Sequence, residues 1–147
     1  MDNKLKSKTR LAAIQLISQH LINNQDIEII KNDFDKYYLN TQIDNSLEKI
    51  KYNVNFLSLL VTYFKNINKE TLYQDINHNL DFQRKFEKWD TINKAIILMA
   101  IAELQNTSKD KFKILLNDYI DISKLFVSLK ETKLINAILD KLINEKK

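Results

Sequence analysis

The chain has 147 residues, enough for one domain with a sizeable core, and 44% of its residues are hydrophobic, as is usual for a folded protein. It contains no Cys, which excludes disulfides, zinc–thiolate sites and cysteine nucleophiles, and no Gly or Pro, which excludes glycine-rich phosphate loops and nucleophile elbows. The net charge of +4 favours an acidic partner such as nucleic acid, although a genome biased toward Lys, Asn and Ile explains the charge equally well.

The composition favours an all-α fold, because tight β-hairpins depend on Gly, whereas Asn can replace Gly at the end of a helix. Hydrophobic periodicity predicts a compact bundle of about seven helices. The first helix is expected to begin at Thr9 and to end near residue 21, and the second covers 27–38. The third lies within 45–67, with a possible break near Asn53, and Asn68 can cap a short fourth helix.

Residues 94–104 are apolar on every face at helical spacing, which predicts a central helix enclosed by the others. A membrane span needs roughly 20 apolar residues, and charges interrupt this run well before that length. Helices over 109–126 and 131–144 complete the bundle. Because no linker or repeat divides the chain, we expect one domain over residues 1–147. Since the N-terminus carries no recognisable secretion signal, we expect a cytoplasmic protein.

No group of residues in the sequence suggests catalysis. The two histidines, His20 and His78, stand in no metal-binding spacing and beside no Ser or Asp motif, so surface or half-buried histidines are the simpler interpretation. Asp118 and Asp121 are three residues apart, but such acidic pairs are common on solvated helix faces. We therefore expect no enzyme, no metal and no cofactor.

Three groups of basic residues are candidates for binding RNA phosphates. The first is an N-terminal segment that is either a frayed tail or a phosphate-binding arm, the second surrounds Trp89, and the third precedes the last helix. An aromatic ring among basic side chains suits single-stranded RNA, but Trp is more often part of a core, and all three groups are also consistent with ordinary solvated patches. Their members are Lys4, Lys6, Lys8 and Arg10; Arg84, Lys85 and Lys88; and Lys130 and Lys133.

A further candidate is a protein-binding surface on the helix expected over 109–126. Apolar residues occupy two sides of this helix, more than a helix with one buried side needs. A helix packed between two neighbours has the same pattern. The sequence leaves both interpretations open.

Four stretches resemble known motifs in the same order and spacing. Residues 10–15 read RLAAIQ, like R-x-x-A-x-Q, and residues 93–104 fit D-R-A-I-L-R followed by Y-E-L. Residues 113–126 are similar to K-V-x-I-N-E-x-[VI]-E-[LI]-A-K-x-F, and residues 133–141 to K-F-V-N-G-V-L-D-K. These motifs are those of the bacterial transcription antitermination family NusB, which the chain resembles over nearly its whole length.

The resemblance implies an all-α domain of two helical subdomains. It implies a protein that binds the boxA segment of ribosomal RNA leader transcripts together with NusE, a ribosomal protein, and that joins an antitermination complex on RNA polymerase. A homodimer is a further possibility. The alternative from another class is a helical adaptor that binds only protein or itself. A module that precedes ribosomal RNA cytosine methyltransferases is a third, for which we would expect a following catalytic domain.

The resemblance also implies which residues form the site. Ser18 stands where the family commonly has an aromatic residue and Leu134 where it has Phe, so we expect binding by charge more than by base stacking, which contributes about 1–3 kcal/mol per base. Asn117 and Asp140 match the motifs, and we expect them to cap or connect helices. The residues implied to bind RNA are Lys4, Lys6, Lys8, Arg10, Lys88, Lys94, Lys130, Lys133 and Asn136, and those implied to bind NusE are Glu103 and Ser18.

Overall fold

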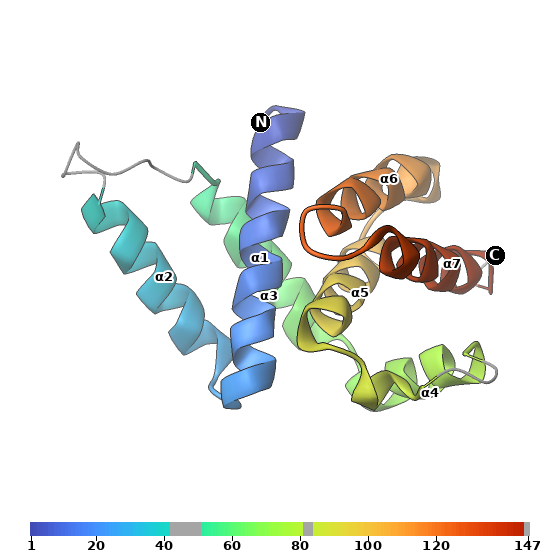
Figure 1. The fold of residues 1–147 in the computed structure, drawn as a ribbon. Helices are drawn as coiled ribbons and strands as arrows, with labels where there is room; N and C mark the ends of the chain where they lie inside the picture. The colour runs from blue at the N-terminus through green and yellow to red at the C-terminus, as the bar shows by residue number, and fades with distance from the viewer. Residues whose placement is uncertain (42–50, 81–83, 146–147) are drawn as a thin grey trace.

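The computed structural model describes residues 1–41, 51–80 and 84–145, and these residues form seven α-helices, two short 3₁₀ helices and no strand (Figure 1). The all-α prediction is confirmed. The helices are α1 (Asn3–Asn23), α2 (Ile27–Thr41), α3 (Val54–Asn66), α4 (Lys69–His78), η1 (Phe86–Lys88), α5 (Thr91–Leu104), η2 (Lys109–Lys111), α6 (Phe112–Ser123) and α7 (Leu129–Glu145).

The helices form two groups that meet at α5. Helices α1, α2 and α3 pack on one another, and α5, α6 and α7 form the second group with α4 beside α7 (Figure 1). Helix α5 contacts α1 and α3 as well as α6 and α7, and every residue from Ala95 to Leu104 is buried. The prediction of an enclosed central helix is therefore confirmed. None of the described helices is long and apolar enough to cross a membrane.

The N-terminal segment is helical, so the expected helix start at Thr9 was wrong. Helix α1 begins at Asn3, where the Asp2 side chain caps it by accepting a hydrogen bond from the Leu5 backbone N–H at 2.7 Å. Thr9 is fully buried. Its hydroxyl is satisfied there, since it donates to the Leu5 carbonyl at 2.7 Å and accepts from the Asn53 backbone N–H at 2.9 Å. The basic segment is thus the first two turns of a packed helix.

Some of the other helix ends also follow local side-chain chemistry. The Asn53 side chain accepts from the Phe56 backbone N–H at 2.8 Å and caps the start of α3, at the position of the possible break, while the predicted helical residues 45–50 lie outside the described residues. Asn24, with φ 54°, ends α1 in the left-handed conformation that Asn tolerates. The helix predicted to end at residue 126 ends at Ser123, and a turn leads into α7.

A buried polar network joins α1 to α5 and α6. Arg10 donates from Nε and Nη2 to both carboxylate oxygens of Glu103, at 2.8 and 2.7 Å, and from Nη1 to Asp118 Oδ2 at 2.6 Å. The Tyr119 hydroxyl donates to Glu103 Oε1 at 2.7 Å, and the guanidinium lies over the Phe56 ring at 5.5 Å. Planar bidentate pairing of this kind fixes both the distance and the orientation of two helices.

The charges in this network stabilise one another. Burial by itself lowers the pKa of Arg10, but the hydrogen bond and the charge of Glu103 outweigh that effect and raise it, so the guanidinium stays charged. Burial, followed by the charge of Glu103, raises the pKa of Tyr119, so its phenol stays neutral and keeps donating. The Arg10 and Glu103 side chains are only 11% and 7% exposed, so loss of either leaves a charge that water cannot solvate.

We predict that Arg10→Met destabilises the protein by about 3–5 kcal/mol, because it leaves the buried carboxylate of Glu103 and the half-buried carboxylate of Asp118 without their cation. The matched control is Lys8→Met on the same helix, where the exposed side chain makes no ion pair with the described residues and the expected change is within about 0.5 kcal/mol. The free energy of unfolding in urea measures both variants. An Arg10→Met loss no larger than that of the control would contradict the structural role.

We predict that Tyr119→Phe flattens the loss of stability at alkaline pH. An unfolded tyrosine ionises near pH 10.0, whereas burial raises the pKa of Tyr119 in the fold, so above pH 10 the unfolded state binds fewer protons and unfolding becomes easier. The variant should reduce the slope of unfolding free energy against pH by about 1.4 kcal/mol per pH unit. Tyr37→Phe, at a position 60% exposed, is the control, and an equal effect of both variants would refute the prediction.

Candidate nucleic-acid interface

The first basic group lies on the N-terminal turns of α1. Lys4 and Lys8 are exposed and four residues apart, so they share one face of the helix, whereas the half-buried Lys6 lies on the other side of the helix with Arg10. None of the three forms an ion pair within the described residues. Three cations at a helix N-terminus are unfavourable for the helix dipole, and a phosphate group bound there would relieve this repulsion.

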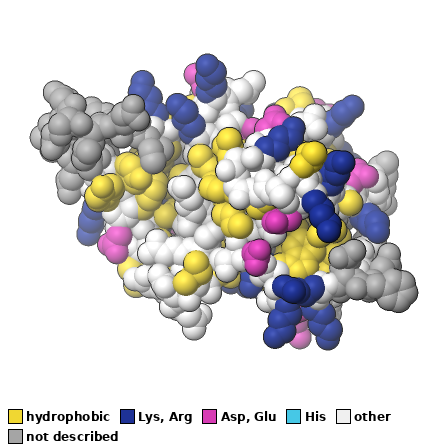
Figure 2. All heavy atoms as spheres, viewed as in Figure 1, with side chains coloured by type: hydrophobic (Ala, Val, Ile, Leu, Met, Phe, Trp, Pro, Cys, Tyr) yellow, Lys and Arg dark blue, Asp and Glu magenta, His cyan; other side chains and the backbone are white. Residues whose placement is uncertain are grey.

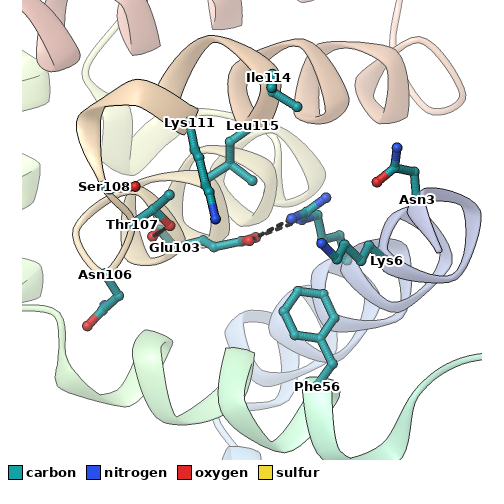
Figure 3. A pocket seen from close by; sticks show the side chains of 11 residues that line it. Asn3, Lys6, Phe56, Glu103, Asn106, Thr107, Ser108, Lys111, Ile114 and Leu115 are labelled. Carbon is teal, nitrogen blue, oxygen red and sulfur yellow. Dashed lines mark hydrogen bonds and ion pairs between the residues drawn. The ribbon is translucent and has the colours of Figure 1, made fainter. Parts of the chain in front are cut away.

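Arg10 and Glu103 are brought together, although the family resemblance implies that one binds RNA and the other NusE. Their ion pair lies at the edge of a hollow of about 480 Å³, to which α1, α3, α5 and α6 contribute. Figure 3 shows Lys6 and Lys111 reaching toward this hollow from α1 and from η2, with Phe56 below them. A ligand in the hollow would meet these lysines first and the already paired guanidinium behind them.

The second basic group surrounds Trp89, which is half-buried and belongs to the packing of η1. Its indole N–H donates to the Arg84 carbonyl at 2.9 Å, and its ring packs edge-on against Phe86 with centroids 5.4 Å apart. These contacts fit a structural role for Trp89 better than a role as a stacking platform for RNA bases. Lys88 is exposed, and Lys94 is half-buried with its ammonium 3.4 Å from the Glu87 carbonyl.

The third group lies on the first turns of α7. Lys130, Lys133 and Asn136 are exposed at intervals of three residues, which places them along one stripe of the helix. The Asn93 side-chain N–H donates to Glu131 Oε2 at 2.9 Å, and this bond holds the start of α5 against the start of α7. Lys94 therefore lies on the helix start next to the one that carries the lysines of α7.

Two buried polar atoms have no hydrogen-bond partner within the described part of the chain, namely Ser18 Oγ and Asn93 Oδ1. Ser18 was among the residues implied to bind NusE, but Asn93 was not predicted. Its position just before the apolar run of α5 offers one signal, since a buried amide needs partners on both of its polar atoms. Each of these atoms is buried at a free-energy cost that a hydrogen bond would remove.

On the face of the molecule that Figure 2 shows, basic side chains gather in several areas. In the view of Figure 2, Lys and Arg gather over the N-terminal end of α1, over α6 and α7, and over the segment between α4 and α5. Apolar and acidic side chains lie between these three areas. The face thus offers separate cationic patches rather than an unbroken strip, and a flexible single strand can connect such patches.

The histidine contacts are structural. His20 Nδ1 lies 2.5 Å from the Gln25 carbonyl and its Nε2 lies 3.3 Å from Lys69 Nζ, while its ring packs edge-on against Phe64. Within residues 1–41, 51–80 and 84–145, no group of three His, Cys, Asp or Glu side chains is placed to hold a metal ion.

Comparison with known proteins identifies the family. Residues 7–144 match the model of the NusB family. The chain is 31% identical to the transcription antitermination protein NusB of Rickettsia bellii (strain OSU 85-389), over 99% of this chain and 96% of that protein. It is 29% identical to the proteins of the same name from Rickettsia massiliae (strain Mtu5) and Rickettsia felis, over 98% of this chain and 96% of each. With both chains matched almost from end to end, this protein belongs to the NusB family.

Proposed function

We propose that this protein is a transcription antitermination factor of the cytoplasm that binds boxA-type single-stranded RNA together with NusE and so joins RNA polymerase. The names of its relatives and the four sequence motifs support this role. The observation that carries it is the placement of lysines that lack acidic partners in the described structure, on the starts of α1 and α7 and beside the start of α5. The role requires binding only and no chemical step.

Pairing decides which basic side chains contribute to binding. A cation that is already neutralised by a carboxylate releases no counterions from RNA, whereas an exposed, unpaired lysine does. By this criterion Lys4, Lys8, Lys130 and Lys133 bind phosphates. Arg10 instead supports the surface from below, because Glu103 and Asp118 occupy its guanidinium.

We propose that the NusE contact involves polar residues whose side chains lack a hydrogen-bond partner within the described residues. Glu103 is 5% exposed and fully engaged by Arg10 and Tyr119, so we propose that it acts by fixing α5 rather than by touching NusE. Ser18 and Asn93 are the better candidates, because Ser18 Oγ and Asn93 Oδ1 are buried without a hydrogen-bond partner among the described residues and would gain one where NusE displaces the side chains that cover them.

A second candidate function is a protein adaptor that self-associates, and the turn between α6 and α7 favours it. Leu125 and Leu129 are 71% and 65% exposed, and Phe126 between them is 37% exposed. Three large apolar side chains within five residues form an apolar patch of the kind that marks contact surfaces. This patch is also where a homodimer would form.

We predict that Lys130→Ala with Lys133→Ala weakens binding to boxA RNA in the presence of NusE. Each lost phosphate contact on a single strand should reduce the magnitude of the negative slope of log K against log salt by about 0.7. Loss of both lysines should therefore reduce it by about 1.4. Fluorescence anisotropy over a range of salt measures this. The control is Lys36→Ala with Lys65→Ala, at two exposed lysines of α2 and α3. An identical salt dependence of all variants would contradict the assignment of Lys130 and Lys133 to phosphate binding.

We predict that Leu125→Ser with Leu129→Ser leaves RNA binding unchanged if the first function holds. If the protein acts as a self-associating adaptor, the same pair converts it to a monomer, because the apolar contact area is lost. Sedimentation equilibrium distinguishes the two outcomes. Ile22→Ser, at a side chain 68% exposed on α1, controls for a general effect of exposed apolar residues.

A further inference from the structure

Helix α6 has a second apolar side that the fold covers only in part. Leu115, Tyr119 and Ile122 face the core and are buried. Phe112 and Leu116 form part of a second stripe, four residues apart, and remain half-buried. The two-sided pattern in the sequence is therefore only partly explained by packing between neighbours, since the second side borders a groove.

The groove lies between α6 and α7 and has a volume of about 480 Å³, within the roughly 300–1,000 Å³ that is typical of ligand pockets. Phe112 and Leu116 of α6 and Ile143 of α7 form its apolar floor. A smaller hollow shares Phe112 and Ile143 and extends the apolar floor to Leu142 and Leu104. The floor thus continues beyond a single pocket along the end of α7.

The charges at the rim of the groove are arranged by side. Lys109 and Lys113, one helical turn apart, lie on the α6 side, and Asp140 lies on the α7 side. All three are exposed, and none forms an ion pair within the described residues. Two cations and one anion around an apolar floor favour a ligand with an apolar centre and more acidic than basic groups. Asp140 and the apolar floor disfavour a phosphate backbone.

We propose that the α6–α7 groove is a docking site for an acidic amphipathic helix of a protein partner. Phe112 and Leu116 are spaced by one helical turn, which matches the i, i+4 spacing of side chains on a partner helix, and a ridge of such side chains packs between two helices. Acidic residues on one edge of the partner would pair with Lys109 and Lys113. Asn117 and Asp140, which we expect to cap or connect helices, both line this groove.

The site is separate from the RNA surface, because it uses none of the lysines assigned to phosphates. The probes are designed helical peptides of about 18 residues with Leu at i, i+4 spacing, flanked by Glu in one peptide and by Lys in a second. A third peptide has the Glu flanks but Gln in place of Leu. Each is labelled with fluorescein, and anisotropy with the full chain measures its affinity.

We predict that the Glu-flanked peptide binds about tenfold more tightly than the Lys-flanked one, and that the Gln peptide does not bind. Lys109→Glu with Lys113→Glu should reverse the preference between the two Leu peptides, because both positions are exposed and the change leaves the core intact. Lys36→Glu with Lys65→Glu carries the same change of net charge elsewhere and should preserve it. Chemical-shift changes in an ¹⁵N-labelled protein should map to α6 and α7.

Either of two results would overturn the proposal. One is equal binding of the Glu- and Lys-flanked peptides, and the other is a preference that Lys109→Glu with Lys113→Glu leaves unchanged. Binding to boxA RNA with NusE is measured on the same variant. A loss of RNA binding without a peptide preference would assign these lysines to the RNA surface, whereas normal RNA binding with a reversed peptide preference supports docking and leaves the proposed function intact.

Discussion

The ion pair between Arg10 and Glu103 sets the relative position of the two helix groups. Helix α1 carries the first basic group, and α5 packs against α6 and α7 in the helix group that carries the other two. The Arg10 guanidinium therefore fixes how the basic groups are oriented relative to one another. Hydrophobic packing between α1 and α5 is largely non-directional, whereas a bidentate pair permits one orientation only. The arrangement of the binding face therefore depends on a contact that is itself buried.

The same ion pair explains which parts of the site could be predicted from sequence. The all-round apolar run of α5 and the cap at Asn68 are local patterns, and the structure confirms them. Whether a basic residue is paired depends on partners distant in sequence, and Arg10 is separated from Glu103 by 93 residues. Sequence reasoning therefore assigned it with its lysine neighbours, although its environment differs from theirs.

Helix ends show a similar division between local and tertiary causes. The start of α1 at Asn3 was missed because its first turns lack an apolar stripe, and Asp2 was the local signal that marked it. Trp89 illustrates the opposite case, since its basic neighbours suggested a stacking platform while its ring and indole N–H serve η1. For a chain without Gly or Pro, side-chain caps carry most of the information about where helices begin.

The hydroxyl of Thr9, which joins α1 to the residue that caps α3, has a consequence for how the basic N-terminus meets a ligand. A flexible arm would give up about 1–2 kcal/mol of backbone entropy for each residue that it orders on binding. A segment that is already helical avoids that penalty and holds its ammonium groups at fixed spacing. It also gives up the long capture radius of a disordered tail, so encounter depends on the strand diffusing to a rigid surface.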